Sequence, residues 1–251
     1  MRVSLISNEL NTLRATIHNY MTEHITLFPT TVLKQTRQVS STEKDIWFDL
    51  FLKHSNANGE SSDYIGFEQL HLEESVSDFY NDTLTKAVNE YLKMLSVSTS
   101  MNLNIYLTKS WFNVTNRAGI NNHNHAEHHI SFVYYPHVPQ GNDAGFVLLH
   151  GGKHPNEPYD GFLAVNTFDQ NQFNATQCNL NVSEGTLYLF PSDLYHHIDA
   201  DYQPIQGFHN KQDLNNSRVC VAGDILLTAQ HSTYQRALPP LENWQKLNGN
   251  I

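Results

Sequence analysis

Residues 129–138, HISFVYYPHV, form a short run of β-branched and aromatic residues, and similar runs recur along the chain from Met101 onward. Glycine, proline and asparagine separate these runs, as expected where turns join strands. Strands at such short intervals are typical of a sandwich, jelly roll or barrel rather than of alternating βαβ units. The other runs are LNIYLTKSWFNVT (103–115), GFVLLHG (145–151), GFLAVN (161–166), GTLYLFP (185–191), LYHHID (194–199) and SRVCVAGDILLT (217–228).

The first third of the chain has a different pattern. In residues 75–95 apolar side chains recur at steps of three and four, which predicts a helix with one buried face. We therefore expect a mixed or helical N-terminal region over residues 1–98 that packs on a β barrel over residues 99–230. Residues 231–251 are expected to form a C-terminal tail on the surface. The predicted fold class is mainly β with α additions.

The composition excludes some classes of function. The chain has 251 residues, and its 15 Lys and Arg against 25 Asp and Glu give a formal charge of −10 at pH 7, which argues against a nucleic-acid binder that works through bulk charge. No stretch reaches the roughly 18 to 20 apolar residues that cross a bilayer, and the N-terminus lacks a secretory apolar core. Cys178 and Cys220 do not suggest a disulfide framework, so we expect a cytoplasmic protein with no membrane partner.

Histidines are concentrated in one region. Nine of the 15 lie between His123 and His197, which is a reason to look for a metal site. In the sequence NNHNHAEHH (121–129), residues two apart point to the same side of an extended chain, so His123, His125 and also Glu127 could converge on one point. A polar loop that is rich in histidine by chance is the alternative reading.

A second histidine-containing stretch, GTLYLFPSDLYHHI (185–198), lies far downstream. His196 is expected to share its side with Ile198, whereas His197 faces the other way, so one histidine of the pair enters the barrel. Two ligands close in sequence and a third on a distant strand are typical of non-heme iron sites that leave positions open for substrate and O₂. A closed structural zinc site would require four ligands, commonly including cysteine.

Arg218 begins the last predicted strand. Arg218, Cys220 and Ala222 fall on one face of it, and Val219 and Val221 fall on the other. A long cation beside two small side chains leaves space for a ligand, and a buried guanidinium requires an anion, such as a carboxylate, that can accept its bidentate hydrogen bonds.

The order of these motifs resembles the Fe(II)/2-oxoglutarate oxygenases, in particular a prolyl-hydroxylase-like group with an HxH…H pattern. The resemblance covers about residues 101–228 and rests on WFNV (111–114), Gly119, HNHAEHHISFVYY (123–135), GFVLLHG (145–151), LYLFPSDLYHH (187–197) and Arg218-Val219. It implies a double-stranded β-helix with iron near its mouth and 2-oxoglutarate bound deeper.

Position by position, the resemblance implies that His123, His125 and His196 bind Fe(II). It further implies that Arg218 and Tyr135 hold the distal carboxylate of 2-oxoglutarate. Most of the wider superfamily has HxD where this chain has HxH, so either three imidazoles bind the iron or Glu127 supplies a carboxylate together with His125. The family pattern favours His123, because it has no carboxylate at the position of Glu127.

The implied function is a dioxygenase that uses O₂ to hydroxylate a peptide, an amino acid or a small metabolite. Two alternatives keep the same barrel: a cupin-like metal- or ligand-binding protein without oxygenase activity, and a structural jelly-roll protein. The barrel alone does not decide between them, because one fold hosts many functions.

Overall fold

The computed structural model describes residues 30–58, 68–97, 103–115, 120–141, 145–149, 177–199, 210–229 and 238–245. The chain divides into two units, Met1–Thr30 and Thr31–Ile251, and every element below belongs to the second. The strand expected at residues 161–166 and the histidines at 150 and 154 lie outside the described residues. No helix in the described ranges has the length and apolar character needed to cross a membrane.

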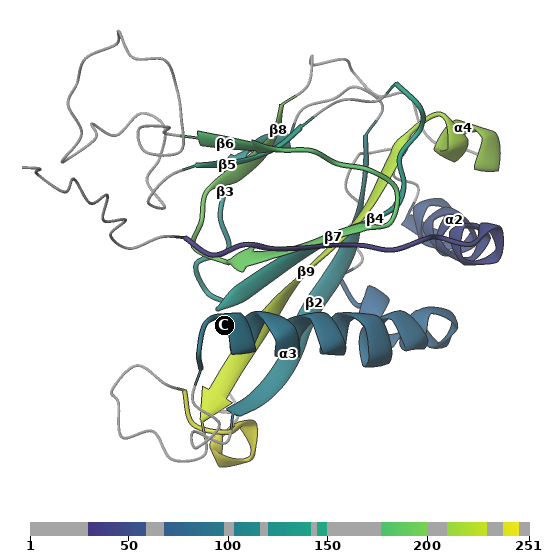
Figure 1. Ribbon diagram of the computed structural model, residues 1–251. Helices are drawn as coiled ribbons and strands as arrows, with labels where there is room; N and C mark the ends of the chain where they lie inside the picture. The colour runs from purple at the N-terminus through teal and green to yellow at the C-terminus, as the bar shows by residue number, and fades with distance from the viewer. Residues whose placement is uncertain are drawn as a thin grey trace, which may run out of the picture. The chain divides into compact units, whose positions relative to one another are not determined.

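Two antiparallel sheets form the architecture, so the predicted mainly β fold with a jelly-roll arrangement is confirmed. The five-stranded sheet has the order β1-β7-β4-β9-β2 and the four-stranded sheet the order β3-β8-β5-β6 (Figure 1). The strands are β1 (Leu33–Thr36), β2 (Leu103–Thr115), β3 (Ile120–His123), β4 (Ile130–His137), β5 (Gly145–Leu149), β6 (Gln177–Leu180), β7 (Thr186–Pro191), β8 (His196–Asp199) and β9 (Arg218–Ala229).

Helical elements come mostly from the N-terminal part of the chain. They are α2 (Ser41–Asn58), the 3₁₀ helices η1 (Leu70–Leu72) and η2 (Glu74–Val76), the π-helix η3 (Phe79–Leu84), α3 (Thr85–Met94), α4 (Lys211–Asn215) and the 3₁₀ helix η6 (Leu241–Asn243). Ser40 caps α2, because its hydroxyl accepts a hydrogen bond from the backbone N–H of Glu43 at 3.1 Å.

The helix predicted over residues 75–95 is present in three consecutive pieces, η2, η3 and α3. Its apolar face is buried as expected up to Tyr91, whereas Leu92 is partly buried and Leu95 at the end is 41% exposed. The π-helical turn is stabilised by the hydroxyl of Thr85, which donates to the carbonyl of Tyr80 at 2.9 Å. Phe79 and Tyr80 of this turn both lie in the core, with their ring centroids 5.1 Å apart.

The five-stranded sheet has two buried faces that alternate along each strand. We call the face packed on α2 and α3 the outer face and the face toward the four-stranded sheet the inner face (Figure 1). The outer face consists of Phe112, Val114, Ile130, Phe132, Tyr134, Leu187, Leu189, Val219, Val221 and Ile225. The inner face carries Trp111, Val133, Tyr135, Tyr188, Phe190, Cys220 and Ala222.

The outer face is an aromatic core. The Trp47 ring of α2 is fully buried and lies 6.1 Å from the Phe112 ring and 5.4 Å from that of Phe79, both edge-on. The Tyr134 hydroxyl donates to the Glu43 carboxylate at 2.8 Å, which ties β4 to α2. The helices therefore fix the position of the sheet whose other face carries the pocket described below.

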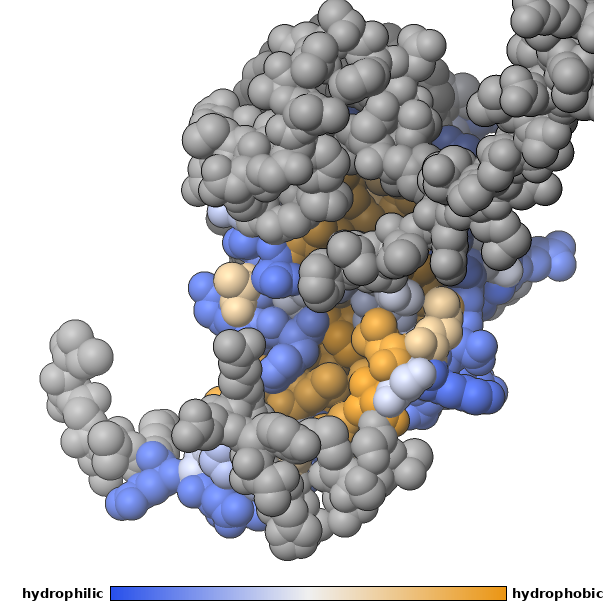
Figure 2. All heavy atoms as spheres, turned by 60° about the vertical axis from the view of Figure 1, so that its left-hand side comes forward, coloured by the Kyte–Doolittle hydropathy of each residue, from blue (hydrophilic) through white to orange (hydrophobic). Residues whose placement is uncertain are grey.

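On the side shown in Figure 2, apolar side chains also gather in a hollow between hydrophilic ones.

Candidate metal centre and anion pocket

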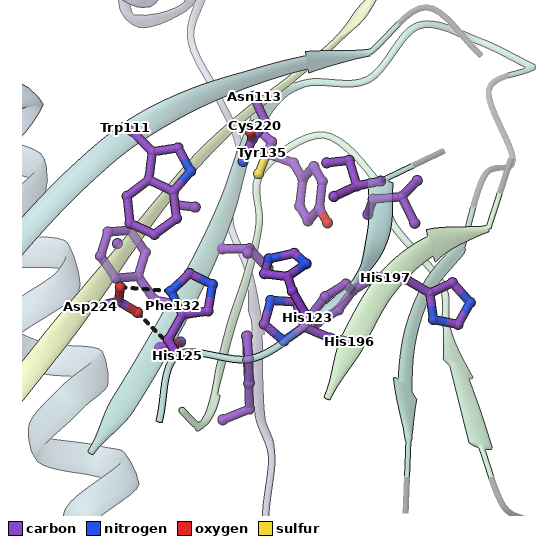
Figure 3. A pocket seen from close by; sticks show the side chains of 18 of the residues that line it. Trp111, Asn113, His123, His125, Phe132, Tyr135, His196, His197, Cys220 and Asp224 are labelled. Carbon is purple, nitrogen blue, oxygen red and sulfur yellow. Dashed lines mark hydrogen bonds and ion pairs between the residues drawn. The ribbon is translucent and has the colours of Figure 1, made fainter. Parts of the chain in front are cut away.

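A pocket with an empty volume of about 510 Å³ lies among inner-face residues of β2, β4 and β9 and residues of β3 and β8 (Figure 3). All five site residues predicted from the sequence line it: His123, His125, Tyr135, His196 and Arg218.

Strand pairing brings the first two histidines together. In the antiparallel pair β3–β8, His123 lies directly opposite His196, and their ring centroids are 4.3 Å apart. His125 follows β3 in a loop that is held in place by its own backbone N–H, which donates to the carbonyl of Ser192 at 2.8 Å. The His125 ring centroid lies 5.1 Å from that of His123 and 5.3 Å from that of His196.

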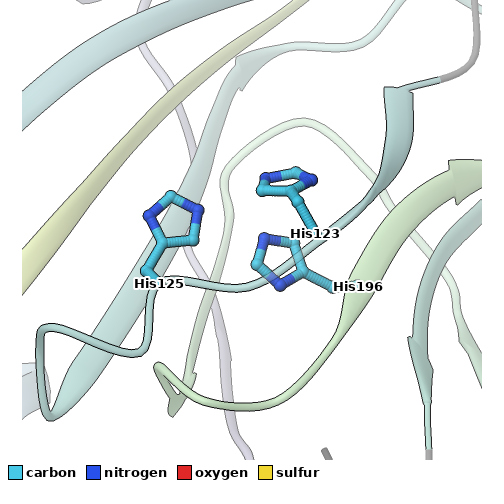
Figure 4. Close-up of side chains that lie close together, drawn as sticks. All are labelled: His123, His125 and His196. Atoms are coloured by element: carbon cyan, nitrogen blue, oxygen red, sulfur yellow. The ribbon is translucent and has the colours of Figure 1, made fainter. Parts of the chain in front are cut away.

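The three side chains point toward one another (Figure 4). One ligand nitrogen from each lies within 4.8 Å of the other two, so the group could hold a metal ion. Glu127, the alternative ligand considered from the sequence, lies in an exposed turn outside this group.

Hydrogen bonds fix the tautomer of all three rings. Nδ1 of His123 lies 2.7 Å from the carbonyl of Asn121, and Nδ1 of His196 lies 2.9 Å from that of Leu194. Nδ1 of His125 lies 2.8 Å from the Asp224 carboxylate. Carbonyl and ionised carboxylate oxygens only accept, so each Nδ1 carries the proton and each neutral ring keeps its lone pair on Nε2.

Burial also favours the neutral form of two of these rings, His196 and His123. It lowers the pKa of His196 to about 3, with the neighbouring His123 adding to the effect. Burial likewise lowers the pKa of His123. Because neutral imidazole is the form that binds metals, His123 and His196 have the required protonation state at pH 7.

Aromatic side chains hold the rings in place. Trp111 stacks on His125 with 5.4 Å between centroids and 13° between planes. Phe146 and Phe190 contact the His196 ring edge-on, at 5.7 and 5.0 Å. The histidine group therefore sits against an apolar wall that limits the access of water.

Asp224 is a site residue that the sequence interpretation missed. It lies on the inner side of β9, its side chain is fully buried, and its carboxylate binds Nδ1 of His125 and accepts from the Ser131 hydroxyl at 2.6 Å. Burial raises its pKa, but the hydrogen bonds from His125 and Ser131 outweigh this and hold the pKa below its ordinary value. The signal was available: the alternation of Arg218, Cys220 and Ala222 continues to Asp224 two residues later.

Arg218 and Tyr135 lie together on the inner face. Arg218 is 2% exposed and Tyr135 fully buried, and the guanidinium carbon lies 5.8 Å from the tyrosine ring centroid. The Tyr135 hydroxyl has no hydrogen-bond partner within the described part of the chain. Burial, with Cys220 nearby, raises its pKa well above the ordinary value, so the hydroxyl keeps its proton. A buried cation beside a hydroxyl that can donate is suited to binding an anion.

Three other histidines among the described residues of the region, His128, His129 and His197, do not join the metal group. His197 leaves β8 on the other side and points away from the three rings (Figure 3). Nδ1 of His128 lies 3.8 Å from Asp224, beyond hydrogen-bond distance. Nδ1 of His129 accepts the backbone N–H of Leu227 at 3.1 Å, so this nitrogen is already engaged.

Residues 109–205 match the family model described as "Putative 2OG-Fe(II) oxygenase". The predicted resemblance to this family is confirmed. The match contains His123, His125, Tyr135 and His196, whereas Arg218 and Asp224 lie beyond its end. A comparison with curated proteins finds no match.

Solved structures of 2OG-Fe(II) oxygenases are similar at low identity. A Burkholderia pseudomallei member of this family has 12% identity and a TM-score of 0.40, with 67% of this chain covered and 64% of that one. A Pseudomonas putida prolyl-4-hydroxylase has 14% identity and a TM-score of 0.43, with 78% and 92% covered. HygX from Streptomyces hygroscopicus, solved with nickel and 2-oxoglutarate bound, has 12% identity and a TM-score of 0.48, with 78% and 82% covered.

Proposed function

We propose that this chain is an Fe(II)- and 2-oxoglutarate-dependent dioxygenase that hydroxylates a peptide, an amino acid or a small metabolite. In this proposal His123, His125 and His196 bind the iron, and Arg218 and Tyr135 hold the distal carboxylate of 2-oxoglutarate. The cytoplasmic location inferred from the sequence remains a prediction.

The observation that carries the proposal is the common state of the three histidines. Each has its Nδ1 committed to an acceptor, which leaves the Nε2 atoms of all three free to bind a metal. Imidazole is a good ligand for iron, and three protein ligands leave the other positions of an octahedral ion open. The donor set therefore fits an iron ion that must also bind a cosubstrate and O₂.

The second half of the pocket fits the cosubstrate. A dicarboxylate that reaches the metal at one end needs an anion site at the other, and Arg218 with the Tyr135 hydroxyl provides two kinds of donor there. Bound iron and 2-oxoglutarate would supply the oxidising chemistry, with succinate and CO₂ as co-products. The protein's own part is to orient both groups and to exclude water with the aromatic wall.

An anaerobic titration with Fe(II) and 2-oxoglutarate tests the proposal directly. We expect a visible metal-to-ligand band in the wild type, its loss in His196→Ala, and its retention in the matched control His197→Ala. Equal bands in the two variants would contradict the assignment of His196. Separate replacement of His123 and Glu127 by alanine tests the other ligand choice, and iron loss in Glu127→Ala alone would favour the carboxylate.

Turnover distinguishes the dioxygenase from a binding protein with the same barrel. We expect the iron-loaded wild type to convert 2-oxoglutarate to succinate in air, slowly without a substrate and faster with the right one. Iron and 2-oxoglutarate binding without any succinate, across a panel of peptides, amino acids and small metabolites, would favour the non-catalytic cupin-like alternative.

A further inference from the structure

Asp224 is a buried carboxylate that the proposed function does not use. Its side chain has no exposed surface, yet it lies in the pocket wall beside His125. An ionised carboxylate in such a place is costly unless it is paired and hydrogen-bonded.

Two hydrogen bonds satisfy the Asp224 carboxylate. Oδ2 binds Nδ1 of His125 at 2.8 Å, and Oδ1 accepts from the Ser131 hydroxyl at 2.6 Å. Strand register explains the second contact, because Ser131 of β4 lies directly opposite Asp224 of β9. Lys109 is farther away, with its Nζ 3.4 Å from Oδ2. Ser131 of the sheet thus holds one oxygen of the carboxylate, and the other oxygen faces the His125 ring (Figure 3).

His125 is set apart from the other two histidines by this contact. His123 and His196 donate from Nδ1 to backbone carbonyls, which are neutral, whereas His125 donates to an ionised carboxylate. A carboxylate acceptor fixes the ring's tautomer and orientation and increases the basicity of its other nitrogen. Of the three rings, His125 should therefore be the strongest donor to a metal.

The charge of the metal site is a second reason to consider Asp224. Three neutral imidazoles leave a divalent ion with its full charge, whereas one carboxylate ligand would reduce it to about +1 by simple addition. In this chain a carboxylate stands one hydrogen bond away from the ligand group instead of within it.

We propose that Asp224 is a positioning residue of the metal site. It orients His125, fixes its Nε2 as the metal-binding nitrogen, and supplies the negative charge that the three histidines lack. The inference rests on the proposed function for the identity of the metal ligands, but its effect on His125 exists in the metal-free protein as well.

Binding of Co²⁺ to the chelator-treated protein gives the first test. Asp224→Asn keeps the shape and an oxygen acceptor but removes the charge, and Asp224→Leu also removes the hydrogen bond. We expect the dissociation constant for Co²⁺ to rise roughly tenfold in the first variant and up to about 100-fold in the second. Thr228→Val on the same strand is the matched control, because the buried Thr228 hydroxyl has no partner in the described part of the chain.

A double-mutant cycle tests the route of the effect. If Asp224 acts through His125, Asp224→Asn should weaken Co²⁺ binding much less in a His125→Ala background than in the wild type. Equal effects in both backgrounds, or wild-type affinity in both folded Asp224 variants, would overturn the proposal.

A measurement on the metal-free protein separates this inference from the proposed function. The imidazole ¹⁵N chemical shifts of His125 should report a proton on Nδ1 in the wild type and a growing share of the Nε2–H form in Asp224→Leu. An unchanged tautomer in that variant would overturn the positioning role. If instead the wild type and His196→Ala bind Co²⁺ equally, the three-histidine assignment fails while the tautomer result still decides the role of Asp224. Asp224→Ala, which also removes the oxygen acceptor, serves for the shifts if the leucine variant does not fold.

Discussion

The two faces of the five-stranded sheet are built from alternate residues of the same strands, yet they differ in what they contain. The outer face packs apolar and aromatic side chains against α2 and α3. The inner face carries a guanidinium, a carboxylate and a buried phenol next to the histidine group. Along one strand, successive residues thus alternate between packing against the helices and lining the pocket. A substitution can therefore be directed at one face without touching the other.

The largest effect should come from the outer face. Phe132 is fully buried on β4, and replacing it by alanine should lower the free energy of unfolding by about 3–5 kcal/mol. Urea denaturation of the metal-free protein measures this. The neighbour Val133 lies on the inner face, and Val133→Ala is the control, with a smaller loss of stability. A smaller loss of unfolding free energy for Phe132→Ala than for Val133→Ala would contradict the assignment of the main packing role to the outer face.

The second effect belongs to the inner face. Arg218→Met keeps most of the side-chain volume and removes the guanidinium, which should weaken 2-oxoglutarate binding by about 2–5 kcal/mol, or roughly 30- to several-thousand-fold. Isothermal titration calorimetry with iron-loaded protein measures the change, and iron affinity should fall far less.

The neighbour Val219 provides the matched control for Arg218. It is fully buried on the outer face, so Val219→Ala should destabilise the fold and leave 2-oxoglutarate affinity near that of the wild type. An unchanged affinity in folded Arg218→Met would mean that the anion site lies elsewhere.

A side chain added at Gly223 should have an intermediate effect on stability, because the outer face has no space for it there. A Cβ there would lie 2.5 Å from Cε1 of Phe132 and 2.6 Å from the backbone carbonyl oxygen of Lys109. The second contact is with backbone of the paired strand, so Gly223→Ala should destabilise the protein by about 1–3 kcal/mol. Thermal unfolding measures the loss, and a wild-type melting temperature would show that the strands can separate more easily than the packing indicates.

The smallest effect is a pH dependence that comes from the inner face. Because the pKa of His196 falls from 6.5 to about 3 on folding, the unfolded chain binds more protons between these values. Stability is therefore complete above about pH 6.5 and is lost as the pH falls, by about 1.4 kcal/mol per pH unit for one proton. Urea midpoints of metal-free protein at pH 7.5 and 5 should differ, and His196→Gln should reduce the difference. Equal midpoints in the wild type would contradict the burial of a neutral His196.

Much of the fold could be predicted from local pattern. The run at 103–115 coincides with β2, and the run at 217–228 nearly coincides with β9, because alternating apolar residues bounded by turn residues carry this information. The short strand β1 was not predicted. Three of its four residues are polar, and its place beside β7 depends on pairing with a partner about 150 residues away.

The site was predictable where motifs carried it. Alternation along the chain indicated one side for His123, His125 and Glu127, and the family resemblance then favoured His123 over Glu127. Alternation also separated His196 from His197 and indicated a ligand-facing Arg218, and the structure brings these residues to one pocket. Alternation along β9 places Asp224 on the same face as Arg218, but it does not reveal which side chain the carboxylate contacts. His125 and Asp224 are 99 residues apart in sequence. They meet because β4, which follows His125, pairs with β9, and this pairing cannot be seen in the local sequence.

The pairing of His123 with His196 also affects folding thermodynamics. In the strand order β3 lies at the edge of its sheet and pairs with β8, with an irregularity between Ile120 and His123. An ion held by histidines of both strands would act as a cross-link between them, present only in the folded state. By mass action, metal at 100 times its dissociation constant would add about 2.7 kcal/mol to the free energy of unfolding. Amide hydrogens of the edge strand should then exchange more slowly with solvent in the metal-loaded protein. The concentration of available metal would thus determine how often β3 separates from β8.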